Sequence, residues 1–370
     1  MGLLSLSPAR CVRALSVNSI CTLCADVCPT GAIVLSGRLP SINQSTCVGC
    51  AGCVSSCPTE ALAQDDFNPT DFFFDFVSDT SLLVSCQKNV PCVAALGSEH
   101  LIALCGMKKG LNLDIGHCGS CSIGEPILRD LRVRVENVNY CLEAMESEYR
   151  VDLVEEAYTE NEKSEATPDR RDFFKTFHLK KIGAYKANFE REVQMSTDEF
   201  ISHTLDSTHT QGLRTKKITD RRKVFFTALK RLEKPSIYHV VDGERITFTS
   251  QKLMDETKCT ACEMCYRVCP TGALTSDMRN SKIDFDPFLC VKCHLCHDVC
   301  ESDAITVSSS YNLKEWYTPT VQNLVTYLVR RCNECDAMFS SVGGEKICRR
   351  CRLEEEEALE LWGLSNDEQR

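Results

Sequence analysis

The sequence predicts an α+β protein made of several small domains, and three observations support this prediction. Most of the 26 cysteines in the 370 residues fall in runs that have the spacing of metal ligands. Between Leu82 and Val154, stretches of strand length alternate with stretches of helical periodicity. A cysteine-free segment then separates this part from a second cysteine-rich region. The predicted parts are residues 1–65, 66–160, 161–250, 251–310 and 325–370.

The cysteine spacing, the hydropathy and the net charge indicate the cellular location that we expect and the kinds of partner that we exclude. Metal-ligand spacings, together with an N-terminus at Met1–Pro8 that lacks the segments of an export signal, lead us to expect a cytoplasmic protein. No apolar run approaches the roughly 18 residues of a membrane span, so we expect no direct span. The net charge of -10 argues against a nucleic-acid binder.

The most specific motif lies between Cys259 and Cys300. The spacing C-x2-C-x2-C-x3-C occurs there twice in succession. In such runs three close cysteines bind one 4Fe-4S cluster, and the fourth binds the neighbouring cluster. We therefore expect one cluster on Cys259, Cys262, Cys265 and Cys300, and a second on Cys269, Cys290, Cys293 and Cys296. Over about fifty residues this stretch resembles the bacterial two-cluster ferredoxin family.

The first 65 residues repeat the motif with one change. Asn18 stands where the first ligand of the first run belongs, and asparagine is a poor ligand for such a cluster. Either that cluster has three protein thiolates, or another cysteine completes it. Cys11 lies just upstream, and we predict that it does so. The expected clusters are Cys11, Cys21, Cys24 and Cys57, and Cys28, Cys47, Cys50 and Cys53. Similar residues follow the runs in both regions, as in an internal repeat.

The segment 66–160 has a different pattern. Strands are expected at 82–84, 111–115 and 149–154, with a helix at 93–107 and a long amphipathic helix at 128–145. This alternation predicts a small α/β domain with a parallel sheet.

Four cysteines follow the predicted strands of this segment. Residues past the carboxyl ends of parallel strands gather at one edge, so Cys86, Cys92, Cys118 and Cys121 should converge there. The segment loosely resembles the delta subunit of methyl viologen-reducing hydrogenase, on Cys86 and the turn Cys118-Gly119-Ser120-Cys121. The favoured interpretation is a fifth iron-sulfur cluster. A redox-active or structural zinc site and buried free thiols are the alternatives. Cys105 and Cys141, on helices, are expected to be buried thiols.

The segment 161–250 contains no cysteine. A polar linker is expected at 160–168, followed by helices that begin near Asp169 and Asp220, each at an Arg-Arg-x-Phe-Phe-like pattern. The 16 Lys and Arg between Asp169 and Lys234 exceed the 9 Asp and Glu there. We expect a basic helical arm that packs on the ferredoxin domains or on a partner. Both this charge run and the acidic run at 354–357 are expected to be solvated helix faces.

The tail carries two C-x2-C pairs, Cys332 with Cys335 and Cys348 with Cys351. Paired turns of this kind place four thiolates tetrahedrally, which suits one structural zinc ion in a zinc-ribbon-like fold. A rubredoxin-like iron site and a further cubane are the alternatives. An exposed acidic helix is expected to follow.

The motifs together favour electron transfer over catalysis. The sequence shows no dinucleotide-binding fingerprint, haem attachment motif, or paired nucleophile and base. By its resemblance to polyferredoxin-like subunits, the chain is expected to be a non-catalytic subunit of an oxidoreductase complex. It would relay electrons from a low-potential donor (formate dehydrogenase, hydrogenase or ferredoxin) to a partner oxidoreductase. One alternative is a reductase whose middle cysteines reduce a disulfide or small molecule. Another is a redox sensor.

Overall fold

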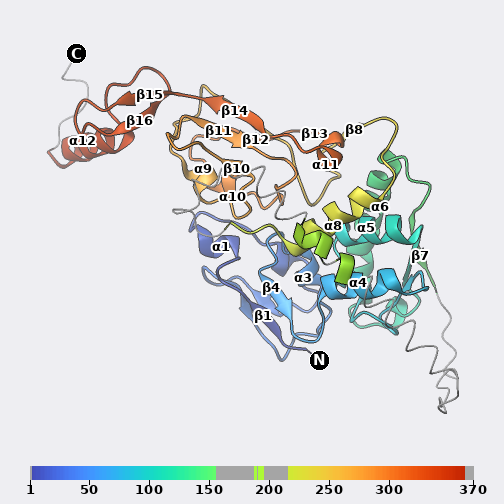
Figure 1. Ribbon diagram of the computed structural model, residues 1–370. Coiled ribbons are helices and arrows are strands. Elements are labelled where there is room, and N and C mark those ends of the chain that lie inside the picture. Colours follow the sequence, from blue (N-terminus) through green and yellow to red (C-terminus); the bar gives the residue numbers. More distant parts are fainter. Residues whose placement is uncertain (1, 156–186, 190, 196–215, 363–370) are drawn as a thin grey trace, which may run out of the picture.

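The computed structural model describes residues 2–155, 187–189, 191–195 and 216–362. The polar linker expected at 160–168 and the helix expected near Asp169 lie outside these residues. Two cysteine-rich domains and an α/β middle domain meet around helix α8 (Asp220–Arg231), while the tail extends away from them (Figure 1). No helix among the described residues is long and apolar enough to cross a membrane.

The two cysteine-rich domains share one plan, in which an outer antiparallel pair of strands encloses a short antiparallel hairpin. In the N-terminal domain the pairs are β1 (Leu4–Leu6) with β4 (Leu62–Gln64), and β2 (Ile33–Val34) with β3 (Ser41–Ile42). In the C-terminal domain they are β9 (Lys252–Met254) with β12 (Ile305–Val307), and β10 (Leu274–Thr275) with β11 (Lys282–Phe285). Strand β14 (Gln322–Thr326) adds to β11. The short helices are α1 (Val12–Leu15), α2 (Leu23–Asp26), α3 (Gly52–Ser56), α9 (Met264–Arg267) and α10 (Leu295–Asp298).

The middle domain contains the predicted parallel sheet. Its strands β5 (Leu83–Val84), β6 (Leu111–Asp114) and β7 (Val151–Val154) lie in that order and all run parallel. Its helices are α4 (Pro69–Ser78), α5 (Ser98–Lys108) and α6 (Gly124–Ala144), with 3-10 turns η1 (Val93–Ala95) and η2 (Cys118–Ser120). Helix α5 packs against both α6 and α8, which explains why its residues from Glu99 to Cys105 are all buried.

Helix α8 belongs to the interior. Its apolar stripe of Val224, Phe225, Ala228 and Leu229 is buried in the largest hydrophobic core. The chain then forms β8 (Val240–Asp242), which pairs with β13 (Ser310–Asn312) before α11 (Lys314–Tyr317). Phe225 packs edge-on against Trp316 of α11. One core therefore joins the middle domain to α8 and to segments on either side of the C-terminal cysteine runs.

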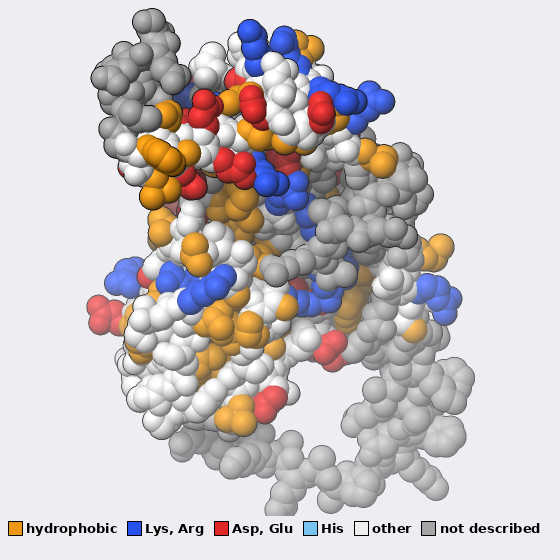
Figure 2. All heavy atoms as spheres, turned by 90° about the vertical axis from the view of Figure 1, so that its left-hand side faces the viewer, with side chains coloured by type: hydrophobic (Ala, Val, Ile, Leu, Met, Phe, Trp, Pro, Cys, Tyr) orange, Lys and Arg blue, Asp and Glu red, His pale blue; other side chains and the backbone are white. Residues whose placement is uncertain are grey.

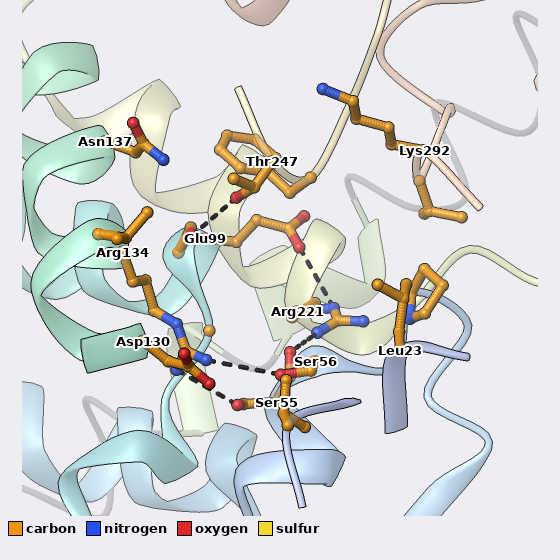
Figure 3. A pocket seen from close by; sticks show the side chains of 17 residues that line it. Leu23, Ser55, Ser56, Glu99, Asp130, Arg134, Asn137, Arg221, Thr247 and Lys292 are labelled. Carbon is orange, nitrogen blue, oxygen red and sulfur yellow. Dashed lines mark hydrogen bonds and ion pairs between the residues drawn. The ribbon is translucent and has the colours of Figure 1, made fainter. Parts of the chain in front are cut away.

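The expectation of a solvated basic helix face is wrong for Arg221 and Arg222, which are 6% and 1% exposed. Arg221 Nε lies 3.2 Å from Glu99 Oε2, and Arg222 Nε lies 2.6 Å from Glu99 Oε1. Both guanidinium groups are buried because one carboxylate of the middle domain pairs with them. Figure 3 shows Arg221 and Glu99 facing each other beside a pocket at the domain junction.

The same two arginines bind main-chain carbonyls of both cysteine-rich domains. Arg221 donates to Ser55 O at 2.6 Å and to Cys57 O in the N-terminal domain. Arg222 donates to Cys290 O at 3.1 Å in the C-terminal domain. The Glu60 carboxylate also accepts from the first two backbone N–H groups of α8, at 2.8 and 2.9 Å. The start of α8 therefore fixes the three domains relative to one another.

The tail is a hairpin of β15 (Leu328–Arg331) and β16 (Met338–Ser341) followed by α12 (Arg349–Leu361). Helix α12 has no buried residue, so the acidic run 354–357 is exposed as expected.

In Figure 2 charged side chains gather on the upper part of the visible face, while the lower part shows hydrophobic side chains among few charges.

Candidate metal centres

The structure gathers the eight N-terminal cysteines into two groups. Group I, which lines one small cavity, consists of Cys11, Cys21, Cys24 and Cys57. Group II, which lines a second cavity, consists of Cys28, Cys47, Cys50 and Cys53. Burial and the neighbouring thiolates of Cys57, Cys21 and Cys11 raise the pKa of Cys24 to about 12, which shows how close these sulfurs lie. The membership is the crosswise one expected from the spacing, with Cys11 in place of the missing first ligand.

Seven of the eight C-terminal cysteines follow the same scheme. Group III denotes the predicted set Cys259, Cys262, Cys265 and Cys300, and group IV denotes Cys269, Cys290, Cys293 and Cys296. Burial and the thiolates of Cys269, Cys290 and Cys296 raise the pKa of Cys293. Burial and the thiolates of Cys296, Cys262 and Cys259 raise the pKa of Cys265. The four cysteines of group IV thus lie close together, and so do Cys259, Cys262 and Cys265 of group III. Cys300 Sγ accepts a hydrogen bond from Ala304 N at 3.2 Å.

The backbone of the runs repeats as closely as their cysteines. In each of the three complete runs, the residues just before and just after the second cysteine have positive φ. These residues are Gly49 and Ala51, Ala261 and Glu263, and Lys292 and His294. Five of these six carry a side chain, which makes the left-handed conformation unfavourable by about 1–2 kcal/mol per residue. The recurrence indicates that wrapping the chain around a bound group imposes this shape. Thr22, after Cys21 in the incomplete run, has φ -124° instead.

Cys86, Cys92, Cys118 and Cys121, the middle group, come together past the carboxyl ends of β5 and β6. Burial and the thiolates of Cys86 and Cys121 raise the pKa of Cys118 to about 11. Burial, and then the thiolates of Cys50, Cys118 and Cys86, raise the pKa of Cys92 to about 12. The sheet therefore places these cysteines together, as expected from its parallel order.

Two further features of the middle domain bear on this group. Asp114 is 1% exposed beside it and accepts hydrogen bonds from Ser85 Oγ at 2.7 Å and Gly116 N at 2.9 Å. The sequence gives no signal for Asp114, because it ends a strand of alternating apolar and polar residues and has no ligand spacing. Cys105 and Cys141 are 0% and 2% exposed on α5 and α6, which confirms that they are buried thiols.

The tail group has the geometry of a site for one ion. The sulfurs of Cys332, Cys335, Cys348 and Cys351 all lie within 4.8 Å of one another, and those of Cys335 and Cys348 are 3.7 Å apart. Four thiolates around a tetrahedral zinc, with Zn–S near 2.3 Å, would be separated by about 3.8 Å. Among the described residues, this is the one group of three or more metal-ligating side chains that is so compact. The other cysteine groups are more widely spaced, as larger clusters require.

Side chains distant in sequence complete the surroundings of the thiols. Tyr327 Oη lies 2.8 Å from Cys259 Sγ, and Ser250 Oγ lies 3.4 Å from Cys290 Sγ. Backbone N–H groups of Ala61 and Leu274 lie 3.2 and 3.5 Å from the sulfurs of Cys57 and Cys269. The sequence gives no signal for Tyr327 or Ser250, because each reaches its cysteine from outside the motif.

Comparison with protein families agrees with this arrangement. Residues 19–61 and 258–304 each match the model of a 4Fe-4S dicluster domain. These stretches cover about a quarter of the chain and include every cysteine of groups I to IV except Cys11. No curated protein matches the chain. The chain therefore carries two ferredoxin-type 4Fe-4S domains, one on each side of its middle domain in sequence.

Proposed function

We propose that the chain is a cytoplasmic, non-catalytic electron-transfer subunit that links a low-potential donor to a partner oxidoreductase. The observation that supports this proposal is that fifteen of the sixteen cysteines in groups I to IV gather by group, in a chain with two dicluster-type domains. Bound 4Fe-4S clusters would accept and release single electrons at these groups. Formate dehydrogenase, hydrogenase or ferredoxin is the class of donor that fits.

The residues around the thiols fit such clusters. Every donor atom in groups I to IV is a thiolate, the ligand that iron-sulfur clusters take. Leu4, Ile33 and Leu62 are buried beside group II, and Ile283 and Phe285 are buried beside groups III and IV. These apolar side chains exclude water, while backbone N–H groups donate to the sulfurs and stabilise their negative charge.

The middle group supports a fifth iron-sulfur cluster better than the alternatives. Its cysteines converge, yet they are not as compact as the tail group, which argues against a single zinc ion. A disulfide reductase would need a cysteine whose thiol pKa is lowered. The pKa of Cys118 is raised, and nothing in the described residues favours the reductase or the sensor.

Assays on the full-length protein, purified anaerobically, distinguish an electron-transfer subunit from an enzyme. After reduction with dithionite, the chain is expected to give up all its stored electrons to a one-electron acceptor such as a viologen dye of higher potential. It should not catalyse continuous reduction of a small disulfide. Steady turnover of the disulfide by the isolated chain would contradict the proposal. Purification from the native host should yield a tightly bound oxidoreductase subunit.

The tail group is proposed to bind one structural zinc. Replacing Cys335 by Ala is expected to remove about one zinc per chain and leave iron and sulfide unchanged, because a tetrahedral site with three thiolates loses most of its affinity. Metal analysis by mass spectrometry checks this, with Cys105→Ala as a control that should keep the zinc. Loss of one iron instead of zinc would favour the rubredoxin-like alternative, and loss of about four would favour a cubane.

Tyr327 is expected to raise the reduction potential of the cluster bound at group III. A metal-bound thiolate can only accept, so the Tyr327 hydroxyl donates to Cys259 Sγ. Such a bond stabilises the more negative, reduced form. Tyr327→Phe should therefore shift one potential to a more negative value in a redox titration followed by electron paramagnetic resonance. Tyr317→Phe is the control, since this hydroxyl has no hydrogen-bond partner among the described residues. Equal potentials in all three proteins would refute the assigned role.

A further inference from the structure

The spatial order of the cysteine groups differs from their order in the sequence. An apolar cluster joins the two ferredoxin-type domains. Val12 of α1 packs against Leu295 and Val299 of the C-terminal domain, and all three are at most 3% exposed. Figure 1 shows α1 lying close to α9 and α10. Ile20 N also donates to Asp298 Oδ2 across this contact, at 3.2 Å.

This contact joins group I to group IV. Cys21 and Cys293, from different domains, both pack against this apolar cluster. Val12 directly follows Cys11 of group I, and Leu295 lies between Cys293 and Cys296 of group IV. The ligand runs themselves therefore form the interface between the domains.

The hydrophobic clusters indicate which of the remaining cysteine groups lie next to each other. Cys50 of group II packs against the core that contains Cys92 of the middle group, and their thiols interact electrostatically. Cys24 of group I packs against the cluster that contains Cys53 of group II. Groups III and IV share one cluster, in which Cys265 and Cys296 interact. The core that contains Cys92 and the cluster that contains cysteines of groups III and IV have no cysteine in common.

We infer that the five groups form one unbranched line, in the order middle group, group II, group I, group IV, group III, and that electrons pass between the domains across the apolar contact that Cys21 and Cys293 flank. This inference rests on the proposed electron-transfer function and adds the route. The middle group and group III are its two ends. The tail group lies outside the line, because zinc has no redox chemistry.

Passage along the line moves one electron at a time. At each step the cluster held by one group would be oxidised by one electron and the cluster held by its neighbour would be reduced by one, with no bond formed or broken. A reduced low-potential iron-sulfur protein supplies the electron at one end, and a one-electron oxidant in the partner oxidoreductase takes it at the other. Donor and acceptor therefore bind at opposite ends, and every electron crosses the interdomain contact.

Magnetic coupling between reduced clusters tests this order without any measurement of activity. The double variant Cys21→Ala/Cys24→Ala removes group I, and its matched control Cys262→Ala/Cys265→Ala removes group III at the same second and third positions of its run. In the fully reduced full-length protein, loss of group I should leave two independent coupled pairs, the middle group with group II and group IV with group III. Loss of group III should leave the coupling between groups I and IV intact.

Two results would overturn the order. One is coupling between the middle group or group II and groups III or IV that keeps its full strength without group I. The other, which needs no variant, is a strong coupling between the middle group and group III in the unaltered protein, where the line requires the weakest. A purified protein without iron and sulfide would sink the proposed function together with the route. A loaded protein that accepts electrons but couples in another order would overturn the route alone.

Discussion

Glu99→Gln is expected to lower the free energy of unfolding by about 3–5 kcal/mol, the usual effect of removing one partner from a buried ion pair. Glu99 is 3% exposed and is the carboxylate that pairs with both Arg221 and Arg222. The amide keeps the shape of the side chain but removes the carboxylate that pairs with Arg222, and it leaves Arg221 with Glu60 alone, whose Oε1 lies 4.0 Å from Arg221 Nε. Because these arginines also bind carbonyls of both ferredoxin-type domains, the loss should loosen the whole junction.

Denaturation of the anaerobic holoprotein in guanidinium chloride, followed by circular dichroism, measures this effect. The control is Glu136→Gln, which breaks a pair with Arg245 whose carboxylate is 76% exposed. Exposed pairs contribute about 0–1 kcal/mol, so the control should unfold close to the unaltered protein. Equal midpoints for the two variants would show that Glu99 does not hold the junction together.

Cys11→Ala is expected to remove one cluster, which lowers the iron and sulfide content by about four atoms each per chain. The first run has asparagine at its first ligand position, and Cys11 is the cysteine that lines the cavity of group I in its place. Without it, group I keeps three thiolates around a cubane that needs four. The expected intermediate stage is a cluster with three irons, visible by electron paramagnetic resonance after oxidation.

The matched control for this change is Cys141→Ala. Cys141 is 2% exposed on α6 and packs in the main core, so the substitution leaves a small cavity and removes no ligand. Iron and sulfide should stay at the level of the unaltered protein. If Cys11→Ala also keeps the full content, then group I either binds its cluster with three thiolates or takes a ligand other than Cys11.

The sequence predicts the parts of this protein whose shape depends on short-range spacing. The C-x2-C-x2-C-x3-C runs were sufficient to locate the two ferredoxin-type domains, and their match to a dicluster domain confirms these domains. The periodicities between Leu82 and Val154 were sufficient for the parallel sheet and for the long helix α6. Each of these signals lies within one local segment.

Features that depend on pairing across long sequence separations could not be predicted. Arg221 and Arg222 lie in a basic segment, for which a solvated helix face is the ordinary expectation. They are buried because they pair with the carboxylate of Glu99, over 120 residues earlier in the sequence. Tyr327 reaches Cys259 from the strand segment that follows the domain. The order of the cysteine groups likewise depends on Val12 meeting Leu295, which no motif encodes.

The iron and acid-labile sulfide content of the anaerobically purified full-length chain, measured with its reductive titration, tests the central claim most directly. Groups I to IV predict about 16 irons and 16 sulfides per chain, and the middle group adds about two to four of each. Dithionite should reduce each cluster by one electron, reversibly. A well-folded chain that holds zinc or free thiols at groups I to IV, and takes up no electrons, would contradict the account.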